Sequence, residues 1–283
     1  MVPGFPTDAW YAVGSAGGLL PGSVMAATVH GIEMAVWRTA SGKAQAFNGR
    51  CPHRGMRLTY GFVRGEQLAC IYHGWHYESS GHCALIPAHP TLNPPKTICA
   101  TSYALVEQDG LLWVAAEAPV EAGGPDAAIG PAAAFCRTVY LDIAADRALA
   151  HVLGAVFPPP GARTSSGTPG EPAVTAAEDL EAGESGRIYM VSWDDRPTRY
   201  ASEQLGTSVV RVTATDADQT STTIVAALQP VSDARTGLHV LVQARRGATA
   251  DAAARRSVNR WVERLRWFTE HEAEAADGYR PWR

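Results

Sequence analysis

Two kinds of hydrophobic pattern follow one another along the chain. Up to about residue 116, short runs rich in apolar, aromatic and β-branched residues alternate with Gly and Pro turns, which is typical of a small β-sandwich. These runs are Met34–Arg38, Gln45–Asn48, Gln67–Tyr72 and Gly110–Ala115. Longer runs typical of consecutive antiparallel strands follow. They are Arg187–Trp193, Ser208–Thr215, Ser221–Leu228 and Gly237–Ala244.

The end of the chain has a helical pattern instead. Val258, Trp261, Leu265 and Phe268 recur at helical spacing, with Arg and Glu filling much of the remainder, so they predict the buried face of a long helix. The whole pattern predicts an α+β fold with two domains: a sandwich over residues 1–118, and a sheet with a C-terminal helix over residues 134–283. Residues 119–133 are rich in Pro, Gly and Ala and predict a linker.

Composition narrows the class of protein. The 283 residues are 46% hydrophobic, and the net charge is −4, which provides no basic face for nucleic acid. No run resembles an apolar span of about 20 residues, and the N-terminus lacks the basic and apolar stretches of a signal peptide. We therefore expect a cytoplasmic globular enzyme without a membrane segment.

Two Cys-His pairs carry the candidate chemistry. Cys51-Pro-His53 and Cys70-Ile-Tyr-His73 each supply one sulfur and one nitrogen. This interleaving favours a [2Fe–2S] cluster in which one iron takes both thiolates and the other takes both imidazoles. A structural zinc site is the alternative, although zinc fingers usually pair Cys with Cys and His with His. The other three cysteines have no repeat spacing and predict free thiols: Cys83, Cys99 and Cys136.

The stretch from Asn48 through Cys-Ile-Tyr-His-Gly-Trp to Pro87 resembles the N-terminal domain of Rieske non-haem iron oxygenases. The resemblance covers roughly the first 118 residues and implies that both Cys-His pairs lie on loops at the tip of a β-sandwich. Met56 and Tyr72 stand where cytochrome-type Rieske proteins have an extra disulfide, so the resemblance is to the oxygenase and ferredoxin types. It also implies that Arg54 and Trp75 shield the cluster.

The second half resembles the helix-grip catalytic domain of the same oxygenases, but its iron ligands are depleted. The family pattern places two histidines on one helix. Here only His151 matches and remains a candidate remnant ligand, whereas Val156 occupies the position of the second histidine. Ala145 and Ala148 replace the family's Asn and its bridging Asp. A mononuclear Fe(II) is therefore weakly supported.

The third, carboxylate ligand has no strong candidate either. Glu263 lies near the expected place but projects away from the apolar seam of the predicted helix, and Glu272 lies near the helix end. An iron with unconventional ligands would need His151 together with residues such as His239 or Glu272.

These features predict an electron-transferring role. No motif for a nucleotide or flavin is present, so reducing power must come from an external ferredoxin or flavin reductase. The resemblance implies a trimeric or hexameric ring in which a cluster reduces the iron of a neighbouring subunit. Our leading hypothesis is a Rieske oxidoreductase that serves a partner oxygenase subunit with intact ligands. The alternatives are a self-sufficient oxygenase with atypically ligated iron, and a structural subunit that needs the cluster to fold.

Overall fold

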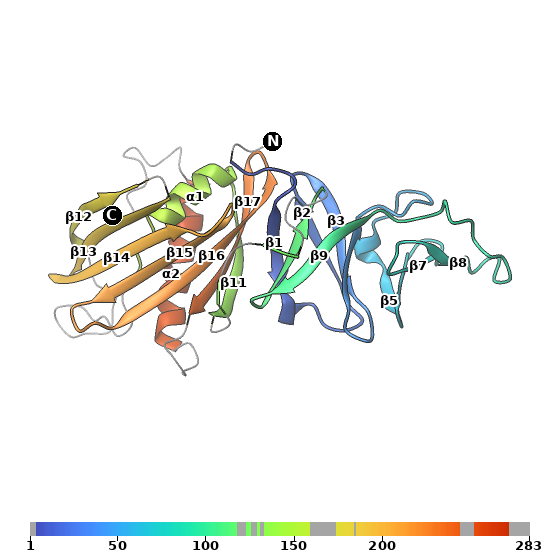
Figure 1. Cartoon of the computed structure of the whole chain (residues 1–283), viewed down its shortest axis with the longest axis horizontal. Helices are drawn as coiled ribbons and strands as arrows, with labels where there is room; N and C mark the ends of the chain where they lie inside the picture. Colours follow the sequence, from blue (N-terminus) through green and yellow to red (C-terminus); the bar gives the residue numbers. More distant parts are fainter. Residues whose placement is uncertain are drawn as a thin grey trace. The chain divides into compact units, whose positions relative to one another are not determined.

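The computed structural model describes residues 4–117, 123–125, 129–130, 133–158, 174–183, 185–243 and 252–271. The chain divides into two compact units (Figure 1). The first contains Pro6–Pro125 with Pro230–Ser232, and the second contains most of the chain from Asp126 onwards. The predicted domain boundaries at residues 118 and 134 stay predictions, because much of the stretch between them lies outside the described ranges.

The first unit is built on a six-stranded antiparallel sheet in the order β1-β10-β9-β4-β3-β2. Its strands are β1 (Trp10–Ser15), β2 (Val24–Val29), β3 (Ile32–Arg38), β4 (Ala44–Asn48), β9 (Ser102–Gln108) and β10 (Leu111–Ala115). Large aromatic side chains such as Trp37, Phe47 and Trp113 are fully buried in it. The predicted runs around β3, β4 and β10 are thus confirmed as strands.

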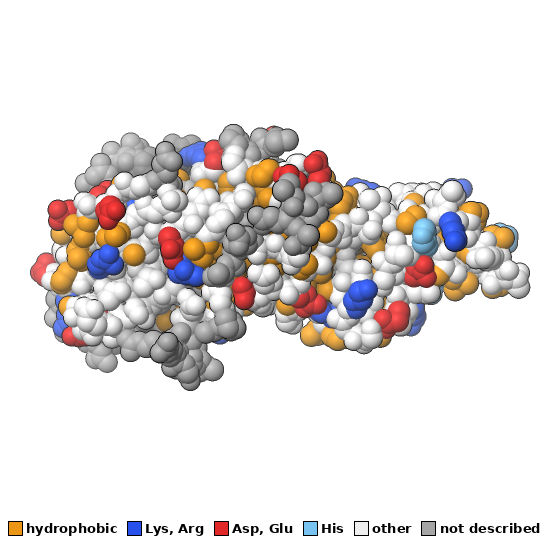
Figure 2. Space-filling view, viewed as in Figure 1, with side chains coloured by type: hydrophobic (Ala, Val, Ile, Leu, Met, Phe, Trp, Pro, Cys, Tyr) orange, Lys and Arg blue, Asp and Glu red, His pale blue; other side chains and the backbone are white. Residues whose placement is uncertain are grey.

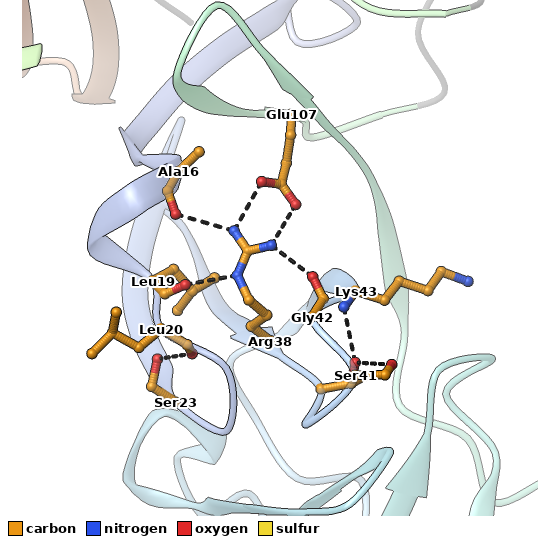
Figure 3. A network of polar contacts seen from close by, with 10 residues as sticks. Ala16, Leu19, Leu20, Ser23, Arg38, Ser41, Gly42, Lys43 and Glu107 are labelled. Atoms are coloured by element: carbon orange, nitrogen blue, oxygen red, sulfur yellow. Dashed lines mark hydrogen bonds and ion pairs between the residues drawn. The ribbon is translucent and has the colours of Figure 1, made fainter. Parts of the chain in front are cut away.

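A buried arginine joins the strands of this sheet to the neighbouring turns (Figure 3). Arg38, at the end of β3, makes two hydrogen bonds to the carboxylate of Glu107 on β9, at 2.6 and 2.9 Å. The same guanidinium donates to the carbonyl oxygens of Ala16, Leu19 and Gly42. Because all these partners are acceptors, the charge of Arg38 is fully paired although the residue is only 8% exposed.

A small four-stranded sheet carries the predicted cluster loops. Its strands are β5 (Phe62–Arg64), β6 (Gln67–Ala69), β7 (His76–Glu78) and β8 (Cys83–Leu85). The predicted run Gln67–Tyr72 is a strand only as far as Ala69, because the chain then turns through a loop in which Gly74 has φ +67°. Cys70 thus directly follows β6, and β7 begins three residues after His73.

The second unit is a seven-stranded sheet with two helices, in the order β11-β17-β16-β15-β14-β13-β12. Its strands are β11 (Ala133–Leu141), β12 (Val174–Ala182), β13 (Gly186–Trp193), β14 (Arg196–Gln204), β15 (Val209–Asp216), β16 (Ser221–Ser232) and β17 (Arg235–Gln243). The helix α2 (Ala252–Glu270) packs on β11 and β17. The predicted sheet-then-helix order and the apolar seam of α2, which is buried, are therefore confirmed.

The helix α1 (Ala145–Leu153) differs from the expectation in one respect. It ends before Val156, so the two positions that match histidine ligands do not share a helix. Gly154 follows its last residue and Pro158 lies close behind, and both residues disfavour continuation of a helix. The sequence from Phe157 to Pro172 is rich in Pro, Gly, Ser and Thr and predicts a mobile loop. Only Phe157 and Pro158 of this stretch lie within the described residues.

Candidate cluster site and comparisons with known proteins

The two loops that carry the Cys-His pairs share one backbone plan. In the first, the N–H of Cys51 donates to the carbonyl of Met56 at 2.8 Å, and the N–H of Gly55 returns to the carbonyl of Cys51 at 2.9 Å. The second loop, from Cys70 to Trp75, repeats both bonds at 2.9 and 3.0 Å. The fifth residue of each loop is a glycine with positive φ, +70° and +67°, which a residue with a side chain adopts only with strain. Both cysteines are thereby fixed in equivalent local geometry.

These loops bring all four predicted ligands to one place. Cys51 and Cys70 are 3% and 2% exposed, and both belong to the hydrophobic core beneath the loops. The imidazole rings of His53 and His73 lie next to each other, with 4.8 Å between ring centroids and their planes tilted by 59°. His53 is half-buried and His73 is exposed. The site therefore has a buried thiol pair and an imidazole pair nearer the surface.

Both imidazoles are held through their faces. His53 stacks on Trp75, with centroids 4.0 Å apart and planes within 6°, and His73 stacks on Tyr72 at 3.8 Å. Ring nitrogens lie at the edge of an imidazole, so stacking orients the ring without occupying the atoms that bind metal. Trp75 thus lies against a predicted ligand, whereas Arg54, which the resemblance also implied as a shield, is exposed.

The electrostatic environment acts differently on the thiols and on the imidazoles of this site. Burial raises the pKa of the Cys70 thiol, and the neighbouring Cys51 adds to the rise, while backbone hydrogen bonds from Tyr72 and His73 favour the thiolate. Burial, the nearby His73 and then Arg54 lower the pKa of His53, which favours the neutral, metal-binding imidazole. Cationic iron would supply the positive charge that buried thiolates need.

Tyr77 is a site residue that the sequence analysis did not single out. It is fully buried on β7, and its hydroxyl lies 3.0 Å from the Sγ of Cys51. Burial first, and then the bond to Cys51, raises the pKa of the phenol. Tyr77 therefore stays protonated and can donate to a thiolate sulfur. Its place two residues after Trp75, on the strand that follows the second loop, was the available signal.

The donor set fits a [2Fe–2S] cluster of mixed ligation, which takes two cysteine thiolates on one iron and two histidines on the other. A family model for the Rieske [2Fe-2S] domain matches residues 9–102 and thus spans both loops. The chain contains a Rieske domain. The [2Fe–2S] cofactor is supported by this match, while the assignment of the four individual ligands remains our prediction.

Curated relatives match part of the chain. The oxidoreductase NdmD of Pseudomonas putida is 42% identical over 105 residues, which is 37% of this chain and 18% of that protein. The 4beta-methylsterol monooxygenase of Methylococcus capsulatus is 36% identical over 125 residues, 43% of this chain and 33% of that protein. The alignments thus span only about a fifth to a third of the length of these two relatives.

Solved structures resemble the whole chain. Dicamba monooxygenase with 3,6-dichlorosalicylic acid has a TM-score of 0.70 at 17% identity, covering 98% of this chain and 92% of that one. NdmB of Pseudomonas putida CBB5 has a TM-score of 0.64 at 17% identity, covering 93% and 82%. The predicted fold, a Rieske β-sandwich followed by a helix-grip unit, is thereby confirmed.

Beyond the Rieske domain, the positions that match iron ligands lie in apolar surroundings. The ring of His151, in the last turn of α1, contacts the ring of Phe268 at 5.8 Å in an edge-to-face arrangement. Ala145, Ala148 and Val156 are buried, at 0%, 0% and 3% exposure. Among the described residues of both units, no group of three or more His, Cys, Asp or Glu side chains is placed to hold one metal ion. A mononuclear iron needs three such ligands, whereas each iron of a mixed-ligand [2Fe–2S] cluster takes only two from the protein.

The residues considered as unconventional iron ligands are engaged elsewhere or lie outside the described residues. His239 on β17 is fully buried; its Nδ1 lies 2.8 Å from the hydroxyl of Thr138, and its Nε2 lies 3.0 Å from Gln229. Glu263 is exposed on α2 and forms an ion pair with Arg137 at 2.5 Å. Glu272 lies outside the described residues. Both ring nitrogens of His239 are thus engaged within the core.

The described residues include no helix that is both long and apolar enough to span a membrane. Basic and acidic side chains are interspersed over the face seen in Figure 2. The five cysteines are all free thiols, and of the three outside the predicted ligand set Cys83 is buried and Cys99 and Cys136 are half-buried.

Proposed function

We propose that this chain is a Rieske oxidoreductase that receives single electrons from an external ferredoxin or flavin reductase and passes them to a mononuclear iron oxygenase centre in a partner subunit. The observation that carries the proposal is the pairing in one site of two buried thiols with two face-stacked imidazoles. A bound [2Fe–2S] cluster would supply reversible one-electron chemistry there.

The chain's own residues have separate tasks in this function. Cys51 and Cys70 would hold the inner iron, and Tyr77 would donate a hydrogen bond to the sulfur of Cys51. His53 and His73 would hold the outer iron near the protein surface, where a redox partner can approach. Ile71 and Tyr72 in the second loop are 54% and 55% exposed and border this surface.

The division of labour with a partner subunit rests on the second unit. Val156 has no donor atom for a metal, and Ala148 replaces the aspartate that the resemblance would place between iron site and cluster. Electrons that reach the cluster would therefore need an acceptor on another chain. A hetero-oligomeric ring, trimeric or hexameric, would bring such an acceptor close. The oxidoreductase NdmD and the 4beta-methylsterol monooxygenase, which each match part of this chain, support an oxidoreductase of an oxygenase system as the context.

The test is iron content and electron paramagnetic resonance (EPR) of the dithionite-reduced full chain, alone and with a co-expressed oxygenase subunit. We expect about two iron atoms per chain, a Rieske signal, and substrate turnover only with the partner. About three iron atoms and turnover by the chain alone would contradict the proposal and favour a self-sufficient oxygenase. A cluster that exchanges no electrons with any ferredoxin or reductase would favour a structural subunit.

A further inference from the structure

The residues that follow α1 enter the interior of the second unit. We call Ala155–Pro158 the plug segment. Ala155, Val156 and Phe157 are only 0%, 3% and 0% exposed. The helix α1, which precedes the plug segment, packs on β14, β15 and β17, while α2 packs on β11 and β17. The plug segment lies where both helices and the β13–β14 part of the sheet meet.

Three hydroxyl groups hold the backbone of the plug segment. The donors are Tyr189 on β13, Tyr200 on β14 and Ser257 on α2, and the acceptors are the carbonyl oxygens of Ala155, Phe157 and Pro158, respectively. All three donors are buried. Because an irregular backbone in a protein interior must have its polar groups paired, these side chains make burial of the plug segment possible.

Aromatic rings surround the side chain of Phe157 in the plug segment. The ring of Phe157 packs edge-to-face on Tyr200 at 5.7 Å and lies 6.3 Å from the ring of Trp261 on α2. Tyr189 stacks on Tyr200 with ring planes within 5°, and the indole N–H of Trp193 donates to the hydroxyl of Tyr200 at 2.9 Å. Rings with a few convergent hydroxyl donors are also the usual lining of a pocket for a planar, carbonyl-bearing small molecule.

We propose that a small-molecule site lies between β13, β14 and α2 of the second unit and that the plug segment occupies it. The ring of Phe157 fills its volume, and three backbone carbonyls use the hydroxyl donors that a planar carbonyl compound would use. This inference deepens the proposed function and rests on it, because it gives the reason why substrate would be handled by the partner subunit. Its own support lies wholly within the second unit.

The first test is binding of indole to the full chain by calorimetry and thermal shift. Wild-type protein is expected to show no saturable binding up to millimolar indole. Phe157→Ala should open an apolar cavity and gain saturable binding, as apolar cavities of ring size do. Phe268→Ala, a matched removal of a ring on α2 that bonds none of the three carbonyls, should not gain it. Saturable binding by wild type, or a folded Phe157→Ala that binds no indole, would overturn the proposal.

A second test keeps the rings, in case Phe157→Ala does not fold. The double variant Tyr189→Phe, Tyr200→Phe removes two donors to the plug segment, together with the acceptor of the Trp193 N–H. We expect hydrogen exchange of the Val156 and Phe157 amides to quicken about tenfold or more, since the segment opens more often. Tyr140→Phe, an exposed tyrosine of β11, is the control and should leave exchange unchanged. Unchanged exchange in the double variant would overturn the proposal.

The two proposals fail separately. The EPR signal reports on the Rieske domain and should be the same in all these variants, whatever happens to indole binding. Loss of the proposed electron-transfer role would appear as missing iron or missing turnover with a partner, and neither result depends on the plug segment.

Discussion

The histidines of the two units are held in opposite ways. In the Rieske domain, His53 and His73 are gripped by their faces, through stacking on Trp75 and Tyr72, so the ring edges remain for metal. In the second unit, His239 is gripped by its edges, with one ring nitrogen at Thr138 and the other at Gln229. A histidine whose ring nitrogens are left available is therefore a candidate ligand, whereas one whose ring nitrogens both have partners in the core is not. Residue type alone does not make this distinction.

The same contrast extends to the loops around them. The two cluster loops have the same pair of backbone hydrogen bonds, and each has a glycine at positive φ as its fifth residue. These features hold the backbone at both cysteines in the same conformation. The matching segment of the second unit, which is α1 and the residues just after it, places buried alanines and a valine where donors would be required. The function that we propose therefore assigns electron transfer to the first of these parts and leaves the second as ordinary core.

The largest effect is expected from removal of a face-held histidine. His53→Ala should reduce iron from about two atoms per chain to nearly none and abolish the Rieske EPR signal, because one iron would lose half of its protein ligands. Iron assay and EPR of the purified variant provide the measurement.

His89→Ala is the matched control, since His89 is exposed in the same domain and outside the ligand set. It should keep both iron and signal. A His53→Ala protein that retains two irons and an unchanged g-tensor would show that the ligand assignment is wrong.

The next effect concerns a charged side chain in the core of the Rieske domain. Arg38→Ala should lower the free energy of unfolding by about 3 kcal/mol, because it leaves Glu107 and buried carbonyls without their donor. Urea denaturation measures this change. Arg50→Ala removes an arginine that is 52% exposed and pairs with Glu33, and should cost less than about 1 kcal/mol. An equal loss of unfolding free energy in both variants would contradict the claim that burial makes the Arg38 interactions stronger than those of Arg50.

The sequence alone predicted the cluster residues because their information is local. Each thiol and its histidine lie within four residues of each other, so spacing suffices to identify them. The sequence analysis missed Tyr77 because its role depends on the fold: β7 pairs with β6, and the hydroxyl of Tyr77 then lies next to the sulfur of Cys51. Contacts between residues 26 apart cannot be inferred from spacing.

The second unit shows the other limit of sequence patterns. β12 carries the segment Val-Thr-Ala-Ala-Glu-Asp-Leu-Glu-Ala, which is exposed along nearly its whole length and lacks hydrophobic alternation, so it was not predicted. β14 contains Pro197 and several charges and was missed for a similar reason. These two segments are strands because they pair with their neighbours in the sheet: β12 with β13, and β14 with β13 and β15. Such pairing cannot be inferred from the segment's own sequence. The apolar seam of α2 was predictable because the helical spacing of its apolar residues can be read directly from the sequence.

An intermediate effect is expected from the edge-held histidine. His239→Ala should lower the free energy of unfolding by about 2 kcal/mol, because the half-buried Thr138 and the buried Gln229 would each lose a hydrogen bond. Iron content should stay at the wild-type value, in contrast to His53→Ala. His271→Ala, at the exposed end of α2, is the control and should change stability by no more than about 0.5 kcal/mol. Loss of iron in His239→Ala would mean that this histidine serves a metal after all.

The smallest effect tests tuning of the site by a buried donor. Tyr77→Phe removes only the hydroxyl that lies 3.0 Å from the Sγ of Cys51. A hydrogen bond to a ligand sulfur stabilises the reduced, more negative cluster, so its loss should lower the reduction potential, by about 50 mV if the bond contributes roughly 1 kcal/mol. Protein-film voltammetry should show this shift at unchanged iron content. Tyr72→Phe keeps the ring that stacks on His73 and should leave the potential nearly unchanged, since the hydroxyl of Tyr72 is not the donor to Cys51. Equal potentials for both variants would place the tuning of this cluster elsewhere than at Tyr77.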